Sequence, residues 1–389
     1  MARVGAVVVV ALLAVLVVIG QPRAGASRFT SVVTSPSQVP SPSPALWDLD
    51  ADIGSVMVFS WRGAISSESV LPVLVRDQVG GVLLFTANFG GYAADLKVLT
   101  DRLQELASSH CSAHPILVML DEEGGAMSNV KDPWAPPWPR EMALGGPDHV
   151  RDLERANGAG LAAAGVGLNL APVADVRTNP RDAIIGDRSF GSSPSVVGPS
   201  VAAAVGGLHE GGVGATLKHF PGLGGAAGDP HIAIPTDSES EAQWRAVQMP
   251  GFKAGIDAGA DAVMVTAVYT PGLGSGSTPA LFSSAIIGRL RNELGFSGVV
   301  VTDSLSMWGI GQKWSLPEAA VMALAAGNDM VLLGAAYPSD EDAAVAVVRA
   351  AVLSGRLDRT RLHESAVRVN ALRDRWGRAP TPCARPMVA

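Results

Sequence analysis

An aspartate and a histidine stand two residues apart in a glycine-rich stretch of the chain, at Asp229 and His231. The carboxylate of such a pair can orient the imidazole ring and stabilise its protonated form. Because the unperturbed pKa of histidine is about 6.5, His231 can give and take a proton near neutral pH. The alternative is a solvated surface histidine without a chemical role. The spacing makes Asp229 and His231 a candidate acid–base dyad.

Asp303 is the second candidate, since it directly follows the apolar run Val299-Val300-Val301-Thr302. A carboxylate at the end of a buried strand must be solvated, paired or functional. Its chemistry would be nucleophilic attack on an anomeric carbon, which gives a covalent glycosyl intermediate. The alternative is that Asp303 caps a helix beginning in Ser304-Leu305-Ser306-Met307.

Four further side chains are of types that hold sugar hydroxyls or carbonyl groups. Lys218 and His219 leave one apolar segment together, so a cation and an imidazole stand at the same end of it. Asp121 can accept hydrogen bonds from two adjacent hydroxyls, and Arg188 is a donor fork suited to a carbonyl or carboxylate. Each of the four can instead be scaffold, for example Lys218 paired with Asp121. We interpret them as the candidate substrate-binding residues.

Eight short apolar segments alternate with longer helical patterns, and they are the elements that must position these side chains. Most of the short segments are apolar throughout, as expected for parallel strands covered on both faces. Eight such pairs match a (β/α)8 TIM-type barrel in a single catalytic domain. An open doubly wound sheet is the alternative, but no dinucleotide fingerprint follows the first strand. The predicted strands are Ser55–Phe59, Val82–Phe85, Ile116–Leu120, Gly167–Leu170, Ala215–Leu217, Ala262–Thr266, Val299–Thr302 and Met330–Leu333.

The barrel also predicts where the candidate residues lie. Catalytic groups of such barrels sit where the strands end and the following loops begin. Asp121, Lys218 and Asp303 each stand at the end of a predicted strand. An extra amphipathic helix over Arg361–Trp376 is expected to pack outside the barrel.

The amino terminus has the three parts of a secretory signal: Arg3, an apolar run over Val4–Ile19, and Ala24-Gly25-Ala26 as a cleavage site. We therefore predict a signal peptide over 1–26, with an uncleaved membrane anchor as the alternative. Residues 27–46 are rich in Ser and Pro and are predicted to be a linker. The barrel domain is predicted over 47–378 and a tail over 379–389.

The composition excludes several classes of function. There are 29 Lys and Arg against 36 Asp and Glu, and the formal charge is −7. A net anion without a basic run is a poor partner for nucleic acid. The two cysteines, Cys111 and Cys383, exclude a thiolate metal cluster and leave open either one disulfide or two thiols. Histidines outside the candidate site show no metal-ligand spacing, so no metal site is predicted.

Five blocks in this order resemble glycoside hydrolase family 3, specifically its single-domain bacterial β-N-acetylhexosaminidases. The resemblance runs from about residue 50 to residue 355, and five ordered blocks are more specific than any one alone. The blocks are Asp121-Glu122-Glu123-Gly124-Gly125, the segment 169–176, the segment 184–191, Lys218-His219-Phe220-Pro221-Gly222-Leu223-Gly224 with Asp229-Pro230-His231, and the segment 300–307.

The resemblance implies a retaining mechanism without a cofactor. Asp303 would be the nucleophile, and His231, assisted by Asp229, would be first the acid and then the base. The aspartate–histidine pair points to N-acetylglucosamine rather than glucose as the sugar. The residues implied to hold that sugar are Asp121, Arg188, Lys218 and His219.

We therefore expect an exported, monomeric retaining glycosidase that lies outside the cytoplasmic membrane. It would remove terminal β-linked N-acetylglucosamine from peptidoglycan fragments or related glycosides, and would meet a membrane only if residues 1–26 stay attached. A β-glucosidase or glycoside phosphorylase on the same fold is one alternative. A barrel that binds cell-wall sugars without cleaving them is another. Pro230 and Ala126 depart from the family pattern, as does a sixth strand that ends Met264-Val265-Thr266-Ala267 without a histidine.

Overall fold

The computed structural model describes residues 47–61, 63, 73–74, 78–109, 112–179, 184–229 and 232–378. These residues belong to one compact unit. The predicted signal peptide, linker and tail lie outside the described residues, as do Cys111, Cys383 and His231. Within the described ranges, no helix has the length and apolar character needed to cross a membrane.

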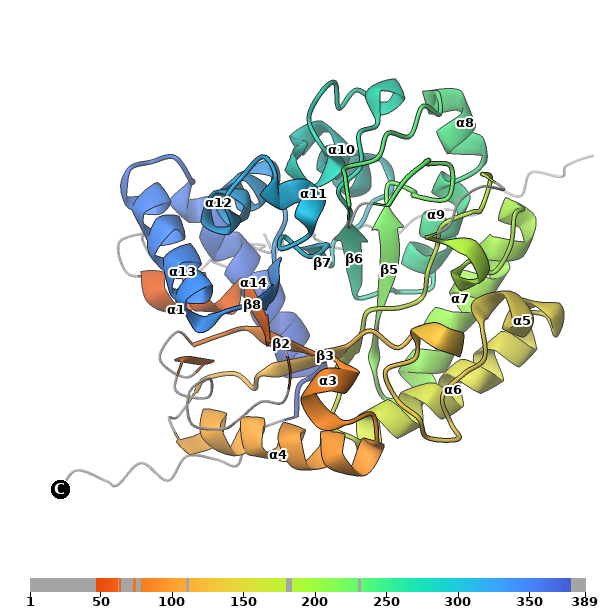
Figure 1. Ribbon diagram of the computed structural model, residues 1–389, viewed down its shortest axis with the longest axis horizontal. Coiled ribbons are helices and arrows are strands. Elements are labelled where there is room, and N and C mark those ends of the chain that lie inside the picture. Colours follow the sequence, from red (N-terminus) through yellow and green to blue (C-terminus); the bar gives the residue numbers. More distant parts are fainter. Residues whose placement is uncertain are drawn as a thin grey trace, which may run out of the picture. The chain divides into compact units, whose positions relative to one another are not determined.

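Eight parallel strands form a nearly closed barrel in the order β7-β6-β5-β4-β3-β2-β1-β8 (Figure 1). The barrel closes where β7 and β8 meet through a parallel bridge between Val301 and Met330. This topology confirms the predicted (β/α)8 barrel and excludes the open sheet. The strands are β1 (Met57–Trp61), β2 (Gly81–Leu84), β3 (Leu117–Leu120), β4 (Leu168–Asn169), β5 (Gly214–Phe220), β6 (Ala262–Val265), β7 (Val299–Thr302) and β8 (Val331–Ala336).

Helices surround the strands, and Figure 1 shows α4, α6, α7, α9, α12 and α13 around them. Neighbouring helices of this ring pack on one another, as α6 does on α7 and α12 on α13. The α-helices are α1 (Leu49–Ser55), α3 (Thr86–Phe89), α4 (Ala93–Ser109), α5 (Pro139–Leu144), α6 (Pro147–Ala163), α7 (Pro194–Gly211), α8 (Glu241–Ala246), α9 (Met249–Asp257), α10 (Ser284–Gly288), α11 (Trp308–Gly311), α12 (Leu316–Ala326), α13 (Pro338–Leu353) and α14 (Arg359–Trp376).

The strands are mostly apolar because both of their faces are buried, and β5 carries Lys218 and His219 at its C-terminal end. Val299 and Val301 of β7 belong to a cluster inside the barrel, whereas Val300 between them belongs to the larger cluster under the helices. The same alternation holds in β1, where Val58 points inward and Phe59 outward. Side chains alternate across a strand, so a strand between two apolar layers must be apolar at every position.

The single helix expected between the fifth and sixth strands is two helices, α8 and α9. Pro250 stands in the first turn of α9, where its missing N–H costs no hydrogen bond, but it cannot continue a preceding helix. Gln248 lies at this break, and its side-chain amide exchanges hydrogen bonds of 2.9 and 3.0 Å with the backbone of Val176. The break therefore places a side chain against the loop after β4.

The C-terminal helix α14 packs outside the strands, as the sequence predicted, and the structure shows that it lies across one end of the barrel. Its Val369 and Leu372 belong to the apolar cluster inside the barrel. Its Trp376 donates a hydrogen bond of 2.8 Å to Asp261, directly before β6. We conclude that α14 covers the N-terminal ends of the strands, which leaves their C-terminal ends for the site.

Candidate active site

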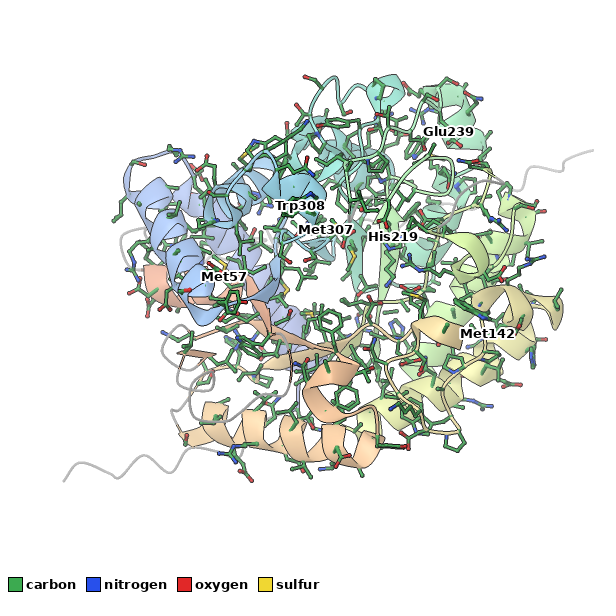
Figure 2. All side chains as sticks on the ribbon, in the orientation of Figure 1. Met57, Met142, His219, Glu239, Met307 and Trp308 are labelled. Carbon is green, nitrogen blue, oxygen red and sulfur yellow. The ribbon has the colours of Figure 1, made fainter. Side chains whose placement is uncertain are left out.

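The predicted binding residues meet at the C-terminal ends of the strands. Asp121 directly follows β3, and Lys218 and His219 belong to the end of β5. Arg188 comes from the short 3-10 helix Gly186–Arg188 in the segment after β4. Figure 2 labels His219, which lies within the ring of helices. The structure thus brings together residues that are up to 98 positions apart in the sequence, Asp121 and His219 being the most distant.

Lys218 is buried between two carboxylates. Its Nζ contacts Asp121 and lies 2.5 Å from Oε1 of Glu123, and its side chain is 1% exposed. Burial alone would lower the pKa of Lys218, but the carboxylates of Asp121 and Glu123 raise it above its usual value. Lys218 is therefore a permanent cation at the floor of the site.

Glu123 is the centre of this cluster, although the sequence did not identify it as a site residue. Arg188 forms a bidentate ion pair with Glu123, in which Nε donates to Oε2 at 2.6 Å and Nη2 donates to Oε1 at 2.7 Å. Burial would raise the pKa of Glu123, but the cations of Lys218 and Arg188 hold it well below its usual range. The role of Glu123 could have been inferred from its two partners, because the cations Lys218 and Arg188 need a buried counter-ion if they are themselves buried.

His219 is held between an acceptor and a donor. Its Nδ1 lies 2.7 Å from Oδ2 of Asp175, and its Nε2 lies 3.1 Å from Nη2 of Arg188. A guanidinium can only donate, so Nε2 must accept and the proton must sit on Nδ1. This assignment makes His219 a neutral imidazole that orients Arg188. Asp175, which also accepts from the backbone N–H of Leu223 at 2.7 Å, fixes the ring.

Two polar groups of the cluster remain for a ligand. Arg188 uses four of its five N–H groups on Glu123, His219 and the carbonyl of Ile184, and one N–H on Nη1 has no partner among the described residues. Asp121 is 30% exposed, and its Oδ2 likewise has no partner within the described ranges. One donor and one acceptor therefore stand at the edge of a buried ionic network.

Asp303 directly follows β7, and both of its oxygens accept hydrogen bonds. Oδ2 accepts from the hydroxyl of Thr266 at 2.7 Å, and Oδ1 accepts from the N–H of Ser304 at 2.8 Å. The next helix, α11, begins five residues later with Met307 as its N-cap, so Asp303 does not cap it. Asp303 is half-buried, so its carboxylate is oriented and still reachable.

Asp229 lies in the segment between β5 and α8, and this segment is tied to its neighbours. Ala227 and Thr236 form an antiparallel bridge that closes the segment on itself, and Thr236 pairs with Tyr269 after β6. On the far side, the carbonyl of Ile232 accepts a hydrogen bond of 3.3 Å from Gln312, which follows α11. His231 itself lies outside the described residues, so its predicted approach to Asp303 stays a prediction.

A second buried network supports the loop after β3. Oε2 of Glu122 accepts from the backbone N–H groups of Asn129 and Val130 at 2.8 and 3.2 Å. Burial raises the pKa of Glu122 to about 7 and that of Glu154, on α6, also to about 7. The negative charge of Glu122 contributes to the shift at Glu154, so the two carboxyls are electrostatically linked. Within the described ranges, neither carboxyl is hydrogen-bonded to a side chain of the four predicted binding residues, and both support the scaffold.

No group of three or more His, Cys, Asp or Glu side chains in the described part of the chain is placed to hold a metal ion. The described side chains of the site are carboxylates, cations and hydroxyls. A buried ionic cluster next to an oriented carboxylate, at the C-terminal end of a barrel, is typical of an enzyme site.

Comparison with known proteins agrees with this geometry. The protein family described as Glycosyl hydrolase family 3 N terminal domain matches residues 44–372 of this chain. A beta-hexosaminidase of Idiomarina loihiensis is 32% identical over 321 residues, which cover 79% of this chain and 93% of that protein. The beta-hexosaminidase LpqI of Mycobacterium tuberculosis is 32% identical over 361 residues, which cover 90% of this chain and 89% of that protein.

Solved structures agree as well. A family 3 β-N-acetylglucosaminidase of Paenibacillus sp. FPU-7 superposes with a TM-score of 0.81 at 32% identity, covering 88% of this chain and 66% of that chain. A β-N-acetylhexosaminidase of Beutenbergia cavernae has a TM-score of 0.77 at 31% identity, covering 84% and 98%. The chain therefore belongs to glycosyl hydrolase family 3, as a glycoside hydrolase of the β-hexosaminidase type.

Proposed function

We propose that this chain is an exported retaining enzyme that removes terminal β-linked N-acetylglucosamine from peptidoglycan fragments or related glycosides. The observation that carries the proposal is the half-buried carboxylate of Asp303, oriented by Thr266 and Ser304 at the end of β7. Each oxygen of Asp303 accepts one hydrogen bond from the described residues and keeps a lone pair, so it can form a bond to carbon.

In the first step, an oxygen of Asp303 attacks the anomeric carbon while the bond from that carbon to the aglycone oxygen breaks. The departing oxygen takes a proton from the imidazolium of His231, which becomes neutral. The product is a glycosyl ester of Asp303 and a free alcohol. Asp229 would stabilise the charged imidazole before this transfer.

In the second step, the neutral His231 takes a proton from water as the water oxygen attacks the same carbon. The ester bond breaks, and its electron pair returns to the carboxylate of Asp303. Two displacements at one carbon restore the original configuration, so the enzyme would be a retaining one.

The ionic cluster would hold the sugar that forms the ester. Asp121 offers an unpaired oxygen to sugar hydroxyls, and Arg188 offers one N–H to a carbonyl such as that of an acetamido group. Lys218 and His219 would act through these two, because Lys218 is buried against Asp121 and His219 orients Arg188. A pre-ordered cluster of this kind loses little conformational entropy when the sugar binds.

Trapping the ester tests the proposal. A slowly hydrolysed substrate that keeps the 2-acetamido group, such as a 5-fluoro N-acetylglucosaminyl derivative, should add one sugar mass to the intact protein, and peptide mapping should locate the sugar on Asp303. Asp303→Ala should take up no label. A label on another residue would refute the assignment, and turnover without any adduct would indicate attack by the substrate's own acetamido oxygen.

The remaining alternatives differ in substrate and in acceptor. Rates on aryl N-acetylglucosaminide and aryl glucoside, each with and without phosphate, separate a hexosaminidase from a glucosidase and hydrolysis from phosphorolysis. We expect the acetamido sugar to be preferred and phosphate to have no effect. Calorimetric binding without release of reducing sugar would instead support a barrel that only binds glycans.

A further inference from the structure

A cavity opens at the N-terminal ends of β6 and β7, and we call it the basal cavity. Its volume is about 410 Å³, which is in the range of pockets that hold small organic ligands. Five residues of extended chain, about 16 Å, separate Gly298 at this end of β7 from Asp303 at the other. The basal cavity is therefore distinct from the candidate active site. Its lining includes Asp261, the segment 295–299, Ile256, Arg368, Leu372 and Arg375.

Two arginines of α14, Arg368 and Arg375, stand in the wall of the basal cavity. They are seven residues apart, which is about two helical turns, so they lie on the same face of the helix. The side chain of Arg375 is 60% exposed, and its Nη1 lies 3.1 Å from Oδ1 of Asp261. Nη1 of Arg368 donates to Oδ1 of Asp329 at 3.1 Å. Among the described residues, Nε and Nη2 of both arginines have no hydrogen-bond acceptor, so each arginine keeps N–H groups for a ligand.

The cations next to the basal cavity outnumber their carboxylate partners. The buried carboxylate of Asp329 is shared by three guanidiniums, since it contacts Arg291 and accepts from Arg361 at 3.2 Å and from Arg368 at 3.1 Å. Exposed Glu364 lies 4.0 Å from Nη2 of Arg368, so two carboxylates face three cations within the described ranges. Burial lowers the pKa of Arg291, and the charge of Asp329 offsets this only in part. The nearby cations Arg368 and Arg361 lower that pKa further, so the positive charge of this group is not fully neutralised.

The loop before β7 adds further donors to the basal cavity. The carbonyls of Phe296 and Gly298 accept hydrogen bonds from Nη1 of Arg291 at 3.0 and 2.6 Å, so these acceptors are occupied. The N–H groups of Ser297 and Gly298 have no partner in the part of the chain that the structure describes. Ser297 is exposed, and its hydroxyl is another donor. Guanidinium forks and backbone N–H groups are the donors that proteins use to hold phosphate.

Part of the wall of the basal cavity is apolar. Phe296 and Leu372 are 4% and 6% exposed, and Ile256 is half-buried. Pockets of this kind combine apolar walls with a few polar groups that fix the orientation of the ligand. A ligand that fills the basal cavity must therefore carry an apolar part next to an anionic group.

We propose that the basal cavity binds the phosphate monoester of a small organic molecule. Arg368 and Arg375 pair with the phosphate, and Phe296 and Leu372 pack on the organic part. A monoester carries a charge of about −1.5 to −2 at pH 7 and presents three oxygens, so it can engage two guanidiniums at once. A carboxylate has one charge and two oxygens, which match a single arginine. The inference goes beyond the proposed function, because it concerns the other end of the barrel and involves no glycosidic bond.

Calorimetric titration of the full chain with four matched probes tests the proposal, at constant ionic strength and at about pH 7.5, where the monoester is mostly dianionic. Phenyl phosphate should saturate a single site. Inorganic phosphate lacks the ring and should bind at least about threefold more weakly, because it buries no apolar surface. Benzoate has the same ring with a carboxylate and should bind about two- to fivefold more weakly, since it forms one ion pair fewer. Phenol, the uncharged ring, should give no measurable heat of binding.

Variants assign the binding to residues. Arg368→Gln and Arg375→Gln should each weaken the binding of phenyl phosphate about two- to fivefold, and the double variant roughly tenfold, because two ion pairs are lost. Arg155→Gln removes an exposed arginine paired with Asp152 on α6, and as the matched control it should leave the affinity unchanged. The melting temperature without ligand reports whether each variant folds. Because the side chain of Arg375 is 60% exposed, Arg375→Gln keeps the test available if Arg368→Gln does not fold.

Competition separates the two ends of the barrel. Saturating N-acetylglucosamine should leave the affinity for phenyl phosphate unchanged, because the sugar is a ligand of the candidate active site only. Displacement by the sugar, or an affinity in the double variant equal to that of Arg155→Gln, would overturn the basal cavity as the site. Benzoate or inorganic phosphate binding as tightly as phenyl phosphate would overturn the proposed class of ligand. None of these results bears on the hydrolysis of N-acetylglucosaminides, so the proposed function is tested separately.

Discussion

Thr266 and Asp303 join the ends of two neighbouring strands, β6 and β7, through one hydrogen bond of 2.7 Å between Oγ1 and Oδ2. Backbone pairing puts them in register, because the N–H of Asp303 donates to the carbonyl of Val265 at 2.8 Å. The pairing of β6 with β7 therefore sets the position of the candidate nucleophile. The side chain of Thr266 at the end of β6 is the one that contacts Asp303.

Thr266→Val tests this contact with a side chain of nearly the same shape. We expect kcat/KM to fall roughly tenfold to a hundredfold, because a hydrogen bond to a charged group is worth about 1.5–3 kcal/mol. Steady-state kinetics on an aryl N-acetylglucosaminide provide the measurement. Thr216→Val on β5 is the control, since its buried hydroxyl has no partner among the described residues. Equal rates in the two variants would show that the Thr266 hydroxyl does not act on Asp303.

Glu123→Gln should destabilise the protein and weaken sugar binding together. The substitution removes the counter-ion that Lys218 and Arg188 share, and breaking one side of a buried ion pair costs about 3–5 kcal/mol. Thermal unfolding and KM provide the two measurements. Glu241→Gln breaks exposed pairs with Arg245 and Arg289 and should leave the melting temperature nearly unchanged. A Glu123 variant as stable as that control would contradict the assignment of Glu123 as the centre of the cluster.

Stability should fall between pH 5 and pH 8 because of buried carboxyls. Burial raises the pKa of Glu154 from 4.5 to about 7, so the folded state holds this proton more tightly than the unfolded chain. The resulting stabilisation is complete below about pH 4.5 and is lost as the pH rises through about 7. Glu154→Gln keeps an acceptor for Asn157 and removes the titration, so at pH 8 it should gain on the order of 2–3 kcal/mol relative to wild type.

Chemical unfolding at pH 5, 6.5 and 8 measures this effect. Glu105→Gln on α4 is the control, because its exposed side chain is in water in both states and should leave the pH slope unchanged. If Glu154→Gln and wild type showed the same slope, Glu154 would not be the buried acid responsible.

The sequence predicted the barrel because its signal is repeated. Strands such as β7 are buried on both faces and are therefore mostly apolar, and eight short apolar segments specify the fold and the ends at which Asp121, Lys218 and Asp303 stand. Pro250 marks the helix break in the sequence, but the hydrogen bonds that Gln248 makes there join it to Val176, 72 residues away, and could not be predicted. The end of the barrel that α14 covers could not be predicted for a related reason, since an amphipathic pattern shows that a face is buried but not against which surface.

The same limit applies to the site. Residue types and spacing identified Arg188 and His219 as candidate binding residues. They did not show that Nε2 of His219 accepts a hydrogen bond from Arg188. Glu123 belongs to the block Asp121-Glu122-Glu123-Gly124-Gly125, in which Asp121 and Glu122 are acidic too. The spacing alone could not show which of these three carboxylates is the counter-ion that the two cations share. Only the three-dimensional partners separate Glu123, paired with two cations, from Glu122, paired with backbone N–H groups.

Gly334 of β8 should prove essential for the segment that carries the candidate nucleophile. Its φ is +84°, and a Cβ there would lie 2.1 Å from Oγ of Ser306 and 2.2 Å from Oγ of Ser304. Gly334→Ala must therefore displace the residues next to Asp303, and we expect kcat to fall at least about tenfold with a destabilisation of about 1–3 kcal/mol. Gly355→Ala has a similar φ of +76° and open space around the added methyl, so it isolates the backbone cost and should keep full activity. If Gly334→Ala lost no more activity than Gly355→Ala, the packing of β8 against Ser304 and Ser306 would not control the position of Asp303.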